Sequence, residues 1–579
     1  MPVESSPSIT PVNGPTNLAG DDATPDTAGH RMSRSARWLR TRQFYDEQGP
    51  DAWASGAVPS YVTNNPYFAD ACADVVAAWL TDWHCRPRDP GCATGAGPFH
   101  IVELGAGTGR FAHLFLMSLE SRLRGVRGSG TVDDRAGSID AGIEWKYIAT
   151  DASEKNRTFL REHVALGRLV EAGRLVTARL TPDDTVIRVD GRGEAGFEGE
   201  ARTPLVVIAN YVFDSLPQDC FIVRDGVLHE CLIVEEDEAD PAGARFRHQP
   251  VSRDCYGDPG MDAVLARYRH GPADRSILFP VDALRWIRAL RRIAGDEMLL
   301  LVTDKGYLPG DIGEEGPPSV EVHTDSCSSM LVNFDALGGY VTDAGGEVWF
   351  GPKETDRLLT AAYTFGTPRG GLERVVSPRG GLERVASPRG GLEKFAAAFE
   401  RSFERTSPMD VFQLVDQARR DPPAFDLPAL LSLLRVSRYD PALFTDCFHV
   451  LLSRTRQAPA PMRSDVVSAV HQVSRNVYPV GPADPAAMLC GAFIAELGDP
   501  EDAERILRAA VDTAEPNPPA LYLLGRCLAR TNRATEGLAW IEKALAADPG
   551  FEDYLCFMGI LPQREAKAEA ERLRWETGA

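Results

Sequence analysis

The sequence lacks several features that would place the protein in a membrane or outside the cell. No apolar run approaches the roughly 20 residues that a membrane-spanning helix requires. Residues 1–7 contain neither a basic segment nor an apolar one, so we expect no secretory signal. The 11 cysteines are spread along the chain without the spacing of a disulfide framework. These absences predict a soluble, cytoplasmic protein with reduced thiols.

Positive charge is also scarce. The chain has 62 Lys and Arg residues against 83 Asp and Glu residues, which gives a formal net charge of −21. A protein that binds duplex nucleic acid needs a clustered basic face, so this balance argues against such a partner. We expect no metal site either, because Cys85 and Cys92 do not have the spacing of zinc ligands.

The chain of 579 residues is 43% hydrophobic and 25% charged, which is typical of a globular protein with several domains. Changes in composition and pattern predict four segments. They are a disordered tail (residues 1–34), an α/β domain (35–365), a linker (366–395) and an all-α helical domain (396–579).

One stretch combines a strand, a tight turn and the start of a helix. Residues 100–110 read His-Ile-Val-Glu-Leu-Gly-Ala-Gly-Thr-Gly-Arg. Glycine adopts positive φ and lets a ligand approach the backbone, and a helix start offers free N–H groups. The spacing Glu-x-Gly-x-Gly-x-Gly differs from the Gly-x-Gly-x-x-Gly of dinucleotide-binding folds. The stretch therefore predicts a ligand site at a strand–helix turn.

Two more predicted strands end in polar residues. Residues 144–150 precede Asp151, and the apolar run 204–209 precedes Asn210 and a loop that reads Asn-Tyr-Val-Phe-Asp-Ser-Leu-Pro. In an open α/β sheet, ligands bind beyond the carboxyl ends of the strands, where an acid accepts hydrogen bonds from ribose hydroxyls. We therefore expect Asp151 and Asn210 to lie beside the glycine turn.

The glycine turn resembles motif I of class I S-adenosylmethionine (SAM) methyltransferases, in which it lies against the amino-acid part of SAM. Looser signatures at residues 58–67, 210–217 with the hairpin that follows, and 304–307 with 332–337 occur in the order seen in MidA-like methyltransferases. The mitochondrial member of that family modifies an arginine of a respiratory complex I subunit. The resemblance covers about residues 40–365 and implies a Rossmann-like doubly wound methyltransferase sheet.

The resemblance also implies a set of functional residues. The expected SAM contacts are Thr63, Glu103, Gly105, Ala106, Gly107, Thr108, Gly109, Asp151 and Asn210. Methyl transfer depends on holding the acceptor in near-attack geometry, and Asn210 and Asp214 are the candidate catalytic residues, with Tyr67 and His323 weaker candidates. Tyr211 stands where the family has a glutamate that would orient a guanidinium, so the resemblance does not by itself imply an arginine acceptor.

Two assignments keep a structural alternative. Residues 61–67 precede a helix predicted over 68–83, and they form either a lid over the cofactor or a helix cap with core contacts. Asp214 either orients the acceptor or serves as a turn acid.

The predicted linker contains a ten-residue repeat of the form Ser-Pro-Arg-Gly-Gly-Leu-Glu-Arg-Val-Ala. Proline and paired glycines in each unit favour an extended spacer. Tandem duplication is one explanation of the repeat. The alternative is that Arg369, Arg379 and Arg389 are sites of self-methylation.

The helical domain repeats with a period of 34 residues, most clearly over 484–550, where Gly491 and Leu507 recur as Gly525 and Ile541. This pattern resembles tetratricopeptide repeats, which normally hold a peptide or a protein partner. The sequence thus predicts a SAM-dependent methyltransferase whose helical domain selects a protein acceptor. The alternatives are a small-molecule methyltransferase and a non-catalytic SAM-binding adaptor.

Overall fold

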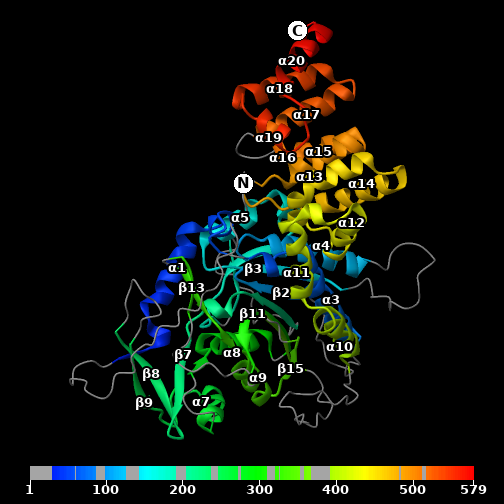
Figure 1. Cartoon of the computed structure of the whole chain (residues 1–579). Coiled ribbons are helices and arrows are strands. Elements are labelled where there is room, and N and C mark those ends of the chain that lie inside the picture. Colours follow the sequence, from blue (N-terminus) through cyan, green and yellow to red (C-terminus); the bar gives the residue numbers. More distant parts are fainter. Residues whose placement is uncertain are drawn as a thin grey trace.

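The computed structural model consists of an α/β body and a helical arm that ends at the C-terminus (Figure 1). The residues it describes are 29–58, 60–85, 98–124, 143–184, 186–190, 204–235, 245–270, 276–295, 297–308, 320–324, 327–352, 358–366, 391–481, 484–511 and 517–578. The predicted self-methylation sites Arg369, Arg379 and Arg389 lie outside these residues.

The body is built on a nine-stranded mixed sheet in the described chain, in the order β15-β16-β11-β6-β2-β3-β4-β5 with β14 beside β11. The parallel central strands are β2 (Phe99–Leu104), β3 (Trp145–Thr150), β4 (Leu175–Arg179), β6 (Leu205–Asn210) and β11 (Met298–Tyr307). The remaining strands are β5 (Arg188–Val189), β14 (Val332–Asn333), β15 (Glu347–Phe350) and β16 (Leu358–Phe365), and β16 is antiparallel to β11.

Helices cover both faces of this sheet because its central strands are apolar on both sides. One face packs against α3 (Pro66–His84), α4 (Arg110–Arg124) and α10 (Glu393–Phe399). The other packs against α8 (Val281–Ala294) and α9 (Phe334–Asp343). The chain proceeds outward from β2 to β3 and β4, then from β6 to β11 in the opposite direction. The predicted doubly wound class is confirmed, and its switch point lies between β2 and β6.

A second, smaller sheet contains the predicted hairpin. Its strands are β1 (His30–Arg31), β7 (Asp219–Arg224), β8 (Val227–Glu235), β9 (Arg245–Pro250) and β10 (Ser276–Phe279). Asp225 and Gly226 both have positive φ, as a two-residue hairpin turn requires. His30 and Arg31 pair with Ile233 and Leu232 of β8, so these two residues, predicted to be disordered, belong to the sheet.

The boundary before the helical domain also differs from the prediction. Helix α10 begins at Glu393, and the backbone N–H of Phe395 donates to Asp82 of α3 at 2.8 Å. The Phe395 ring lies 5.1 Å from that of Trp349 in β15. Together with η6 (Glu400–Glu404), α10 therefore belongs to the body, because its aromatic side chains complete the body's core.

The helical arm comprises helices α11 to α20. They are α11 (Pro408–Arg420), α12 (Leu427–Val436), α13 (Pro441–Gln457), α14 (Ala460–Arg475), α15 (Ala486–Leu497), α16 (Pro500–Val511), α17 (Pro518–Arg530), α18 (Ala534–Ala547), α19 (Glu552–Phe557) and α20 (Ala566–Thr577). A Cβ on Gly491 would lie 2.5 Å from Leu507, and one on Gly525 would lie 2.7 Å from Ile541. The 34-residue period thus places glycine where paired helices touch.

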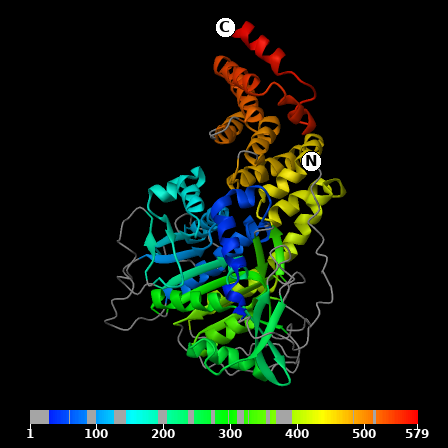
Figure 2. The same ribbon diagram turned by 90° about the vertical axis from the view of Figure 1, so that its left-hand side faces the viewer.

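The arm extends away from the body, with α20 farthest from the sheet (Figure 2). No helix in the described ranges is long and apolar enough to cross a membrane.

Candidate functional site

The glycine turn between β2 and α4 lies at the carboxyl edge of the sheet, next to its switch point. Gly105, Gly107 and Gly109 have φ values of 62°, 53° and 79°, which L side chains rarely adopt. The N–H of Ala106 donates to the carbonyl of Thr150 at 2.9 Å, so the turn is fixed to the end of β3. Gly105 is exposed, and its backbone is open to a ligand.

The third glycine permits close packing of other chain segments. A Cβ on Gly109 would lie 2.0 Å from Leu160 and 3.0 Å from the hydroxyl of Tyr478 in the helical arm. Gly109 thus serves packing, whereas the exposed Gly105 is available for a ligand.

Asp151 follows β3 and holds the glycine turn. Its carboxylate accepts the N–H of Gly107 at 2.9 Å, the N–H of Ser153 at 2.9 Å and the Asn156 amide at 3.1 Å. Burial raises the pKa of Asp151, and these hydrogen bonds oppose the shift. The predicted neighbours Gly107 and Asp151 are therefore in contact.

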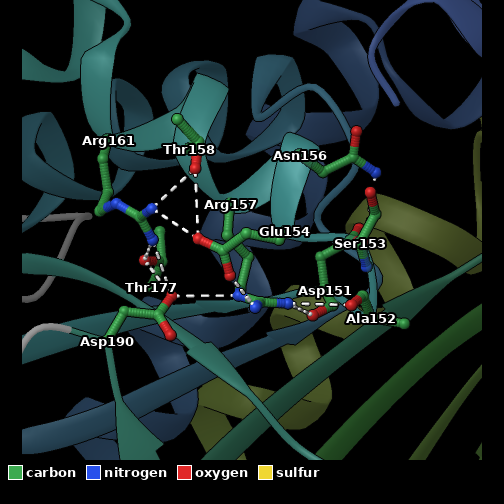
Figure 3. Close-up of polar contacts among 10 residues, drawn as sticks. All are labelled: Asp151, Ala152, Ser153, Glu154, Asn156, Arg157, Thr158, Arg161, Thr177 and Asp190. Atoms are coloured by element: carbon green, nitrogen blue, oxygen red, sulfur yellow. Dashed lines mark hydrogen bonds and ion pairs between the residues drawn. The ribbon is translucent and has the colours of Figure 1, made fainter. Parts of the chain in front are cut away.

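A charged network supports this acid from α5 (Glu154–Glu162) (Figure 3). The Arg157 guanidinium donates to the backbone carbonyls of Asp151 and Ala152, at 2.7 and 2.9 Å. Arg157 also pairs with Asp190 at 3.1 Å, and Asp190 accepts the hydroxyl of Thr177 in β4 at 2.7 Å. The end of β3 is thus fixed to its neighbouring strand.

Asn210 ends β6, beside the glycine turn. Ala209 is the register partner of Leu104, so Asn210 and Gly105 leave adjacent strands at the same edge. The side-chain amide nitrogen and oxygen of Asn210 are both buried and have no hydrogen-bond partner among the described residues. A buried amide without partners is costly, so this side chain is suited to a polar ligand.

The residue that departs from the family pattern has a strained backbone. Tyr211 has a φ of 51°, and its N–H donates to the carbonyl of Thr303 at 3.0 Å. A tyrosine at positive φ is uncommon and persists only where surrounding contacts hold it. The backbone strain at Tyr211 therefore lies in the loop 210–217, which the sequence predicts to be part of the site.

Asp214 lies in the short turn η3 (Phe213–Ser215), whose shape Asp304 fixes. One carboxylate oxygen of Asp304 accepts the N–H groups of Phe213 and Asp214, at 2.8 and 3.2 Å. Asp304 is fully buried, and burial together with nearby Asp214 raises its pKa well above the usual range. Asp304 is thus a structural acid that positions Asp214.

Two aromatic residues that the sequence did not single out cover this edge. They are Tyr45 of α1 (Ala36–Gln48) and Trp53 of α2 (Asp51–Ala54), stacked with ring centroids 5.5 Å apart, and we call them the aromatic lid. A Cβ on Gly107 would lie 3.2 Å from the Trp53 ring. Burial raises the pKa of Tyr45, and Cys327, Asp214 and Asp151 add to the shift. The thiol of Cys327 lies 3.5 Å from the Tyr45 hydroxyl. No motif marks these aromatics in the sequence, because only tertiary packing brings them here.

Residues 61–67, predicted as either a lid or a cap, contain a helix cap and contact the arm. The lid over the cofactor stays a prediction. Asn65 caps α3 by accepting the N–H of Phe68 at 2.9 Å. The hydroxyl of Tyr61 donates to Asp440 of the arm, and that of Tyr67 donates to the carbonyl of Thr406. Thr63 is buried in the same turn, η2 (Tyr61–Thr63), and its predicted SAM contact stays a prediction.

Glu103 faces the helices rather than the carboxyl edge. It is buried at 4% exposure and accepts the hydroxyl of Tyr147 at 2.8 Å. Burial raises the pKa of Glu103 to about 8, so the carboxyl is protonated at neutral pH. His323, a weaker candidate, lies in β12 (Val320–Thr324).

Comparison with known proteins gives matches for both parts of the chain. The tetratricopeptide repeat family model matches residues 495–550, within the predicted repeats. No curated protein matches.

Solved structures from Burkholderia thailandensis are similar to the chain. One, provisionally assigned as a methyltransferase and bound to S-adenosyl-homocysteine, is 16% identical, with a TM-score of 0.33, covering 52% of this chain and 77% of its own. An uncharacterised protein of the same superfamily is 15% identical, with a TM-score of 0.35, covering 57% and 92%. An O-methyltransferase family protein is 11% identical, with a TM-score of 0.27, covering 57% and 65%.

Proposed function

We propose that the α/β body binds SAM at the carboxyl edge of its sheet and transfers the methyl group to an acceptor. The observation that carries the proposal is the unpartnered, buried amide of Asn210, placed one strand away from the exposed Gly105. Asp151 lies one strand away on the other side. A glycine backbone, an acid and an amide at the switch point fit the amino-acid and ribose groups of SAM.

The residues present fit the cofactor in three respects. Gly105 has a positive φ and is exposed, so its backbone is open to a ligand. Asp151 retains acceptor capacity, because its carboxylate offers about four lone pairs and accepts three hydrogen bonds. Asn210 supplies both a donor and an acceptor.

SAM supplies an electrophilic methyl group on a sulfonium. The protein's work is then to orient the acceptor and to exclude water. Trp53 of the aromatic lid covers Gly107, and Tyr45 stacks on Trp53. We assign acceptor orientation to Asp214, which Asp304 holds in place.

We further propose that the acceptor is a protein selected by the helical arm, and that the body is of the MidA-like type. The tetratricopeptide match supports a protein-binding role for the arm. Tyr211 occupies the position of the family's loop glutamate, so arginine is not assigned as the acceptor residue.

The test is transfer of label from methyl-labelled SAM by the purified full chain in a cell extract. Labelled protein is the expected result. Labelled metabolite would favour the small-molecule methyltransferase, and binding without label would favour the adaptor. The negative control is an Asn210→Ala variant, which lacks the side-chain amide that we propose binds SAM.

A further inference from the structure

One of the contacts between the helical arm and the body is made with the glycine turn itself. The hydroxyl of Tyr478, in the segment after α14, donates to the backbone carbonyl of Thr108 at 2.7 Å. Tyr478 is buried at 1% exposure and belongs to the body's hydrophobic core, although it follows an arm helix.

The Thr108 carbonyl needs this partner. Helix α4 begins at Arg110, and its first backbone bond runs from the N–H of His113 to the carbonyl of Gly109. The Thr108 carbonyl lies one residue before this ladder, and a buried carbonyl left without a donor is costly. The missing side chain of Gly109 leaves room for the phenol, since a Cβ there would lie 3.0 Å from its oxygen.

The segment that contains Tyr478 also contacts His163, the residue that caps α6 (Val164–Glu171). The Tyr478 ring stacks on His163 at 3.7 Å, and Nε2 of His163 lies 2.9 Å from the carbonyl of Pro479. His163 caps α6, because its Nδ1 accepts the N–H of Ala165 at 3.2 Å. Nδ1 is thus the acceptor and Nε2 the donor, as in a neutral imidazole. The segment 478–479 therefore bridges the glycine turn and the helices that follow Asp151.

Further contacts fix the arm against the body. Asp440, buried at 1% exposure, accepts the hydroxyl of Tyr61 and caps α13. Arg438 pairs with Asp70 of α3 at 3.0 Å. A change in arm position would thus act on the turn through Tyr478.

We propose that Tyr478 is a positioning residue through which the helical arm sets the shape of the glycine turn and so controls its affinity for the nucleotide ligand. This inference rests on the proposed function for the ligand, but the coupling of arm and turn stands on the contacts alone. By linkage, a protein bound to the arm and SAM bound to the turn change each other's affinity by the same factor.

The test compares Tyr478→Phe with Tyr522→Phe in the full chain. Tyr522 is also buried in the arm and donates its hydroxyl to Glu569 at 2.8 Å, so both variants lose one phenolic hydrogen bond. In the ligand-free proteins, we expect Tyr478→Phe to speed amide hydrogen exchange in residues 106–113 about three- to tenfold, while Tyr522→Phe leaves that segment unchanged. Unchanged exchange in both variants would overturn the inference.

Calorimetry with S-adenosylhomocysteine separates this inference from the proposed function. We expect Tyr478→Phe to raise the dissociation constant about three- to tenfold and Tyr522→Phe to leave it unchanged, although both lower the unfolding temperature. A purely structural role predicts lower unfolding temperatures without a selective loss of affinity, and that outcome overturns the inference. Faster exchange in residues 106–113 of a protein that binds no S-adenosylhomocysteine would keep the coupling and reject the proposed ligand.

Discussion

The indole of Trp53 lies over Gly107, 3.2 Å from the position that a Cβ on that glycine would occupy. The glycine turn is thus confined on two sides, by the aromatic lid and by the hydrogen bond from the Gly107 N–H to Asp151. The remaining open backbone is at Gly105.

Gly107→Ala should weaken S-adenosylhomocysteine binding at least tenfold. The new methyl group would meet Trp53, and the backbone at a φ of 53° disfavours any side chain. Gly226→Ala is the matched control, because Gly226 has a φ of 72° and a Cβ there would meet no atom within 4 Å. In both variants a side chain at positive φ destabilises the fold by about 1 kcal/mol, so only the location of the change differs. Equal affinities of the two variants for S-adenosylhomocysteine, measured by calorimetry, would contradict the assigned site.

Asp151→Asn should also weaken S-adenosylhomocysteine binding about tenfold or more. A hydrogen bond to a charged group contributes about 1.5–3 kcal/mol, and asparagine replaces one acceptor oxygen by a donor. Asp343→Asn, which changes a half-exposed acid paired with Arg267, should bind as the wild type does. Calorimetry on both variants checks this, and unaltered binding by Asp151→Asn would place the ribose elsewhere.

Glu103→Gln should remove a pH dependence of stability. The folded pKa of Glu103 is about 8 and its ordinary value is 4.5, so between these limits the folded state holds a proton that the unfolded state has lost. The stability of the wild type relative to the variant therefore falls as pH rises from about 4.5 to 8, by up to about 1.4 kcal/mol per pH unit. Denaturant unfolding of both proteins at several pH values measures this difference. If the stability of the wild type and that of Glu103→Gln changed with pH in parallel, the prediction would be refuted.

Asp304→Asn should lower the rate of methyl transfer about tenfold while S-adenosylhomocysteine affinity changes less than twofold. Asp304 organises η3 by accepting the N–H groups of Phe213 and Asp214, so these hydrogen bonds act on η3 and not on the glycine turn. Asp335→Asn, which alters an acid bonded to Tyr268, is the control. Loss of binding together with the rate would show that η3 contributes to the cofactor site.

The sequence predicted the parts of the site that depend on local pattern. The glycine turn, Asp151 and Asn210 could be placed at one edge because parallel strands share the direction of their carboxyl ends. Paired glycines at a 34-residue period located the arm's close helix contacts.

Residues brought in from distant segments could not be predicted in this way. Tyr45 and Trp53 reach the site through the packing of α1 and α2, and Tyr478 through the docking of the arm. The predicted end of the disordered tail at residue 34 and the predicted end of the linker at residue 395 differ from the structure for the same reason. His30 and Phe395 lie in segments whose order comes from pairing with β8 and packing on α3, and local composition does not record such contacts.

Calorimetric titration of the wild type and Asn210→Ala with S-adenosylhomocysteine tests the central claim most directly, because Asn210 carries the unpartnered buried amide beside Gly105. We predict one ligand per chain for the wild type and an affinity at least tenfold lower for the variant. No binding by the wild type, or equal binding by both proteins, would contradict the placement of SAM at this edge.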